Sequence, residues 1–104
     1  MDKKIEIQIE QMYRKLSDFK SQNYLQVRRD LIVLIELLLS TRNRMLRVFL
    51  YRVDVNEEKI LKLFNTIPLR GVAEKIADLI IDRELQKLKF RQKIKNKSQD
   101  KYSL

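Results

Sequence analysis

The segment from Tyr24 to Leu39 constrains the fold most, because a helix formed by it would be apolar over most of its circumference. One row of apolar residues recurs at spacings of three and four: Tyr24, Val27, Leu31, Leu34 and Leu38. A second row lies beside it and is widened by two further side chains: Ile32, Ile35 and Leu39, with Val33 and Leu37. Such a helix needs neighbours on several sides. The pattern therefore predicts the central helix of a bundle, or a helix at a subunit interface.

The same spacing predicts helices before and after this segment. Residues 2–20 carry one apolar stripe: Ile5, Ile9, Met12, Leu16 and Phe19. Ile5, Ile7 and Ile9 also alternate with polar residues, as in a strand, but the longer stripe favours a helix. A last helix is expected from about residue 70 into the nineties, and its apolar residues are Val72, Ala73, Ile76, Ala77, Ile80, Ile81, Leu85 and Leu88.

Residues 40–43 leave two interpretations open. Their Ser, Thr and Asn side chains favour a break, because such side chains compete for backbone hydrogen bonds. The apolar stripe nevertheless resumes in register at Leu46, and a continuous helix over residues 23–53 would be roughly 46 Å long. We expect a break or kink near 40–43, since average helices are much shorter.

A shorter helix is predicted between the two long segments. Asp54 can cap its first turn while Glu57 reaches back to the Asp54 amide, as in a capping box. The apolar residues of this helix are Ile60, Leu61 and Phe64. Pro68 ends it, because the residue before a proline avoids the helical conformation.

These elements together predict an all-α fold. We expect a small antiparallel bundle of four helices, or of three if residues 23–53 are continuous, with a basic C-terminal extension. Gly71 and Pro68 are the only glycine and proline in 104 residues, which disfavours hairpin-rich β folds. We expect a single domain over residues 1–95 and a polar tail over 96–104 that frays.

Several chemistries lack the residues that they need. The chain has no Cys and no His, so it lacks disulfides, thiol chemistry and the usual acid–base group and metal ligand. One glycine cannot build a phosphate-binding loop, and no serine or threonine lies in a motif that would activate it. We therefore expect no enzyme activity, no cofactor and no metal.

Glu74, Asp78 and Asp82 would lie in one row on the last helix. A row of carboxylates can bind a divalent cation or a basic partner. We favour a solvated face, or pairing with arginines elsewhere in the bundle, because metal sites built on helical carboxylates also use His.

The longest apolar run, from Leu31 to Leu39, is interrupted by Glu36 and is shorter than the roughly 20 residues of a membrane span. No apolar core follows the N-terminal lysines, so we expect no signal peptide and no membrane association. The expected location is the cytoplasm. Because burying an unpaired carboxylate is costly, we expect Glu36 to reach the rim of the fold or to pair with Arg44 or Arg47.

Positive charge is concentrated at the C-terminal end. The chain has 23 Lys or Arg and 14 Asp or Glu, a net charge of +9. Residues 85–104 hold seven of the cations and one carboxylate, and so contribute +6 of that charge. Cations occupy alternate positions there: Lys87, Lys89, Arg91, Lys93, Lys95 and Lys97. Such a segment either contacts nucleic-acid phosphates or only keeps the chain soluble.

Two stretches carry a resemblance, residues 49–59 with the motif Tyr-Arg-Val-Asp-Val and residues 76–87 with Leu-Ile-Ile-Asp-Arg-Glu-Leu-Gln-Lys. Together they resemble small bacterial all-helical proteins of uncharacterised function, so the resemblance implies a fold and no activity. It directs attention to Arg52 and Asp54 as a turn and cap. Arg83 and Gln86 would tie that turn to the last helix by hydrogen bonds.

The function expected from these features is that of a non-enzymatic helical protein-interaction module with an unknown protein partner. The surplus apolar surface of the central helix favours a homodimer. Its candidate interface residues are Leu31, Leu34, Ile35 and Leu38. The alternative is a nucleic-acid-binding accessory protein that uses the basic C-terminal segment over residues 87–101.

Overall fold

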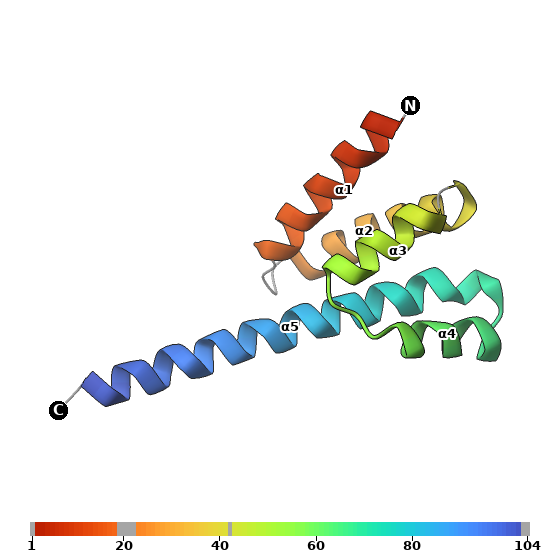
Figure 1. Cartoon of the computed structure of the whole chain (residues 1–104). Helices are drawn as coiled ribbons and strands as arrows, with labels where there is room; N and C mark the ends of the chain where they lie inside the picture. Colours follow the sequence, from red (N-terminus) through yellow and green to blue (C-terminus); the bar gives the residue numbers. More distant parts are fainter. Residues whose placement is uncertain (1, 19–22, 42, 103–104) are drawn as a thin grey trace.

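The chain folds into helices alone over the residues that the computed structural model describes, 2–18, 23–41 and 43–102 (Figure 1). In chain order the helices are α1 (Asp2–Ser17), α2 (Tyr24–Thr41), α3 (Asn43–Arg52), α4 (Glu57–Thr66) and α5 (Leu69–Tyr102). The predicted all-α class is confirmed. The predicted count of four helices is too low: the break near residues 40–43 and the short helix before Pro68, both expected, bring the number in the described residues to five.

The break between α2 and α3 falls where the polar residues predicted it. Ser40 Oγ and Thr41 Oγ1 both donate to the carbonyl oxygen of Leu37, over 3.1 and 2.6 Å. Side-chain hydrogen bonds of this kind compete with the regular helical bonds and bend or end helices. A single helix over residues 23–53 is therefore wrong.

α2 is the central helix, as its wide apolar surface predicted. It packs against α1, α3 and α5, and its contact with α5 is the most extensive in the chain. Leu31, Ile35 and Leu38 of α2 are fully buried, as are Ile76 and Ile80 of α5. Three helices of the same chain thus cover the surface that we assigned to a subunit interface.

The proposed oligomer interface needs a correction for this reason. Its four residues are buried inside one chain and offer no surface to a second copy: Leu31, Leu34, Ile35 and Leu38. An all-round apolar helix has the same sequence pattern whether its neighbours come from its own chain or from another.

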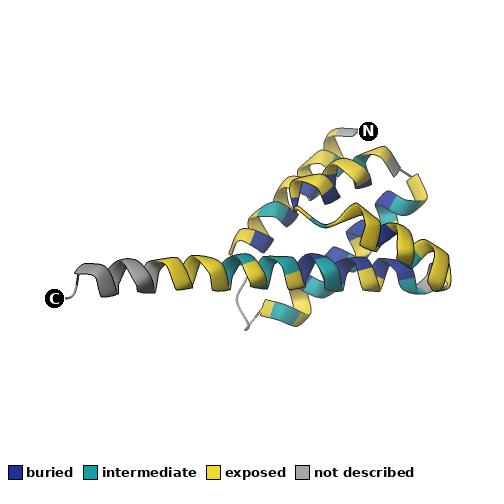
Figure 2. Cartoon of the chain, turned by 60° about the horizontal axis from the view of Figure 1, so that its bottom comes forward, coloured by how far each residue is buried: buried dark blue, intermediate teal, exposed yellow. Residues whose placement is uncertain are grey.

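α5 extends well beyond the body of the protein (Figures 1 and 2). Its first half packs against α2 and α4, whereas residues 89–94 are exposed. Residues 96–102, which we expected to fray, belong to α5. We call residues 89–102 the arm. The molecule measures 56 × 32 × 24 Å, and the arm accounts for much of the longest of these three dimensions.

The turn between α3 and α4 corrects the predicted cap. Asn56, rather than Asp54, caps α4, and its side chain accepts a hydrogen bond from the Glu58 amide at 2.9 Å. Asp54 has a φ of 63°, and its amide donates to the carbonyl oxygen of Tyr51. Asp54 therefore ends α3 in the left-handed conformation, which an N-cap does not adopt. Glu57 is the first residue of α4.

The expected tie between this turn and α5 is confirmed. Arg83 Nη2 donates to Asp54 Oδ2 at 2.6 Å, and Lys87 Nζ donates to the Val53 carbonyl oxygen at 3.0 Å. Gln86 accepts from Arg83 Nη1 at 3.4 Å within α5. Arg52 does not join the turn, because its Nη1 donates instead to Glu10 Oε1 of α1 at 2.9 Å.

Asp54→Asn is expected to destabilise the protein at neutral pH and to matter less in acid. Asn also tolerates the left-handed conformation, so the variant removes mainly the ion pair. The hydrogen bond from Arg83 lowers the pKa of Asp54 below its ordinary value of 3.8. The carboxylate therefore stabilises the fold above that value, and its contribution disappears as the pH falls through the lowered pKa.

Urea unfolding of Asp54→Asn and the wild type, at pH 7 and at several values below 4, measures this difference. The gap in unfolding free energy should be largest at pH 7 and should close in acid. A gap that stays constant with pH would show that the turn depends on the shape of Asp54 and not on its charge.

Candidate functional site

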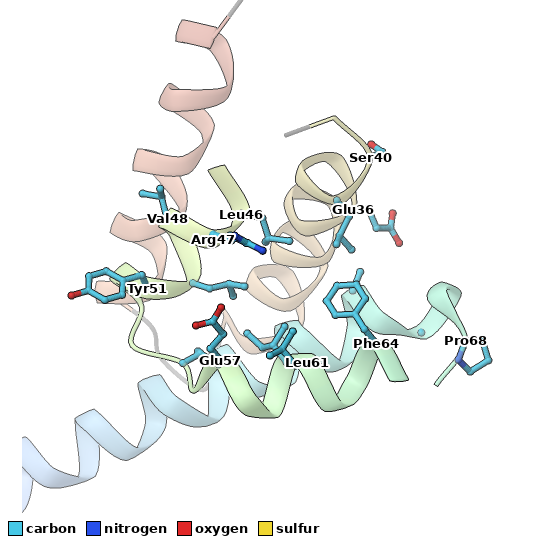
Figure 3. A pocket seen from close by; sticks show the side chains of 16 residues that line it. Glu36, Ser40, Leu46, Arg47, Val48, Tyr51, Glu57, Leu61, Phe64 and Pro68 are labelled. Carbon is cyan, nitrogen blue, oxygen red and sulfur yellow. The ribbon is translucent and has the colours of Figure 1, made fainter. Parts of the chain in front are cut away.

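An open groove between α3 and α4 is the candidate site, and it has a volume of about 1670 Å³ (Figure 3). α3 packs mainly on α2, whereas α4 packs on α5. The two short helices therefore form opposite walls, while the end of α2 and the start of α5 contribute the floor. The turn pinned by Asp54 and Arg83 closes one end of this arrangement.

The walls of the groove expose large apolar side chains. Val48 and Tyr51 on α3 are 61% and 89% exposed, and Leu61 and Phe64 on α4 are 55% and 42% exposed. Buried apolar residues of α3, α4 and α5 also line the groove: Leu46, Leu50, Ile60 and Ala73. Apolar surface gathered in one place costs free energy in water and marks interaction sites on soluble proteins.

Charged side chains lie around this apolar surface. Glu36, Arg47 and Glu57 line the groove with exposed side chains. The Ser40 hydroxyl donates to the Leu37 carbonyl oxygen, and no activating base is paired with it among the described residues. Glu36 thus reaches the rim, as predicted, and its carboxylate remains hydrated. The groove therefore offers apolar contact area bordered by two carboxylates and one guanidinium.

The predicted basic segment divides into two parts. Lys87 belongs to the body, because its ammonium group bonds to Val53 and, at 3.1 Å, to Glu84. Lys89, Arg91 and Lys93 are exposed on the arm. Lys95 and Lys97 lie outside the residues whose side chains are described. Two apolar residues, Phe90 and Ile94, are also exposed on the arm, at 64% and 49%.

The acidic row on α5 is partly used inside the chain. Asp78 accepts two hydrogen bonds from Arg28 of α2, from Nε at 2.9 Å and from Nη2 at 3.5 Å. These bonds raise the pKa of Arg28 above its ordinary value. The pairing of this row with an arginine elsewhere in the bundle is confirmed for Asp78. Among the described residues, no group of three or more acidic side chains is arranged to hold a metal ion.

The sequence did not reveal the groove. Leu61 and Phe64 were expected as ordinary apolar residues of a helix, and no binding role was predicted for Val48 or Tyr51. Their exposure depends on how far apart α3 and α4 lie, which no local pattern specifies. No local signal in the two short helices set these side chains apart from ordinary apolar residues.

In the described ranges, no helix is both long enough and apolar enough to cross a bilayer. The chain matches no protein-family model, no curated protein and no solved structure.

Proposed function

We propose that this chain is a non-enzymatic protein-interaction module whose groove binds the apolar face of a helix from a partner protein. The observation that supports this most is the exposed apolar surface on the facing walls formed by α3 and α4. A partner helix with apolar residues at i, i+3 or i+4 and i+7 would lay that face into the groove. Each wall helix has 10 residues, or about 15 Å, which matches two to three turns of a bound helix.

The polar groups favour a helix over a small molecule as the ligand. Small-molecule sites are usually enclosed and have a few converging polar groups, whereas Glu36 and Glu57 lie exposed along an open groove. Two carboxylates against the single guanidinium of Arg47 favour a partner helix with basic residues beside its apolar face.

Selection of displayed helical peptides on the purified protein tests this proposal. Peptides that bind should share the apolar spacing described above. Their affinity should fall at least tenfold for the variant Val48→Gln/Leu61→Gln, because burying one Val or Leu contributes about 1.5–3 kcal/mol and tenfold is about 1.4 kcal/mol. The variant removes one exposed apolar residue from each wall, so the fold should be retained.

Leu25→Gln/Val33→Gln is the matched control. It also replaces two exposed apolar residues, at 73% and 61%, but on α2 and away from the groove. Selected peptides should bind this control as they bind the wild type. Peptides without the spacing, or with equal affinity for the wild type and the groove variant, would contradict the proposal.

Nucleic-acid binding by the arm is a second candidate function. It is favoured by the exposure of Lys89, Arg91 and Lys93 on a helix that leaves the body. Binding to duplex DNA or RNA would weaken steeply with salt and would be lost in the variant Lys89→Gln/Arg91→Gln/Lys93→Gln. A control with the same charge change replaces three exposed cations on α3 and α4: Arg44, Lys59 and Lys62. Equal nucleic-acid binding by both variants would show that the arm is not the binding segment.

A further inference from the structure

We infer that a second copy of this chain supplies a helix for the groove, so that the arm of each copy lies in the groove of the other. The inference rests on the proposed function, because it names an occupant for the same groove. It also places a homodimer on a different surface from the buried residues of α2.

The arm carries an unpartnered apolar pair. Phe90 and Ile94 are one helical turn apart and continue the face of α5 on which Arg83 and Lys87 contact the turn between α3 and α4. Within the body that face is covered by the chain itself. Beyond the body the pair is exposed, at 64% and 49%, on a helix that needs no folding before it binds.

The residues that line the groove carry a net charge of one negative unit, opposite in sign to the arm. Lys89, Arg91 and Lys93 flank the apolar pair and are exposed. The groove presents the carboxylates of Glu36 and Glu57 against one cation, as described above. Docking the apolar pair would therefore bring cations toward carboxylates, and the complementarity selects a basic helix.

The arm cannot occupy the groove of its own chain. α5 is continuous from Leu69 to Tyr102, and Gly71 and Ala73 at its start line the groove. The groove ends at the turn that Arg83 contacts, and Phe90 lies seven residues after Arg83, or roughly 10 Å further along the same straight helix axis. An arm in the groove must therefore come from another copy. One arm and one groove per chain allow a two-fold exchange with two equivalent contacts.

Sedimentation velocity of nuclease-treated, full-length proteins tests the exchange. The wild type and the control Leu25→Gln/Val33→Gln should dimerise as concentration rises. The arm variant Phe90→Gln/Ile94→Gln and the groove variant Val48→Gln/Leu61→Gln should each remain monomeric. Each variant homodimer would lose both contacts, so its dissociation constant should rise at least a hundredfold. Circular dichroism should show wild-type helicity for all four proteins.

An equimolar mixture of the two variants is the decisive sample. An intact arm on one chain then meets an intact groove on the other, so the mixture should regain association with about half of the contacts. A monomeric wild type at hundreds of micromolar would overturn the inference, as would variants that dimerise normally or a mixture that does not associate. Association present only before nuclease treatment would also overturn it, because nucleic acid would then be what joins the copies. A monomeric wild type whose groove still selects helical peptides leaves the proposed function standing.

Discussion

Phe49→Ala is expected to lower the free energy of unfolding by about 3–5 kcal/mol, because it removes a buried aromatic ring and leaves a cavity. Phe49 of α3 is fully buried. Its ring stacks on Tyr13 of α1, with a centroid distance of 5.1 Å and an interplanar angle of 24°. Arg52 lies 3.8 Å above the centroid of the same Tyr13 ring. Burial raises the pKa of Tyr13, as expected for a phenol at this helix junction.

Urea unfolding followed by circular dichroism measures this loss. Since domains of this size have a total stability of about 5–15 kcal/mol, the variant should remain folded in water but unfold at much lower urea. Val48→Ala, at the preceding and exposed position, should change the stability by less than about 0.5 kcal/mol. Equal effects of the two substitutions would contradict the packing of α3 described above.

Ile35→Ala is expected to cost about 2–5 kcal/mol of unfolding free energy, and it separates a core role from an interface role. Ile35 is fully buried by helices of its own chain. The loss should therefore be present at protein concentrations low enough for the chain to be monomeric. Association at higher concentration should be unchanged for the folded fraction.

Val33→Ala is the control for Ile35→Ala, because Val33 lies on the exposed side of the same helix. It should leave the unfolding curve within about 0.5 kcal/mol of the wild type. A variant Ile35→Ala that unfolds like the wild type but no longer associates would restore Ile35 to a subunit interface.

The sequence allowed the helical segments and the break after the central helix to be predicted. The apolar rows of the segment 24–39 identified the central helix, and the polar residues after it located the break. The tie between Asp54 and Arg83 was also anticipated. The helices and the break depend on local spacing, which the sequence contains, whereas the tie between the turn and the last helix was expected from the resemblance alone.

Features that depend on the arrangement of helices could not be predicted in this way. Asp54 and Asn56 are both good caps, and only the point where α3 ends decides between them. The rows on α2 indicate coverage but not which chain provides it. Exposure of Val48 and Leu61 depends on the separation of two helices that pack on different neighbours.

The arm was also predicted only in part. Its charge was evident from the sequence, since residues 85–104 contribute +6 of the net +9. Its continuous helix and its departure from the body were not. The apolar pair Phe90 and Ile94 gained significance only because no element of the chain covers it in the described structure.

Fluorescence from a single indole in the groove tests the central claim, occupation of the groove by a helix, most directly. The chain contains no Trp, so Phe64→Trp places the only indole on the α4 wall. Wild-type protein, which has no indole and adds nothing to the Trp emission, is titrated into a low concentration of this variant. We predict a blue shift of the emission as an arm covers the groove, and no shift with Phe90→Gln/Ile94→Gln at the same concentrations. An unchanged emission at concentrations where the wild type is dimeric would contradict the account, as would equal shifts with both proteins.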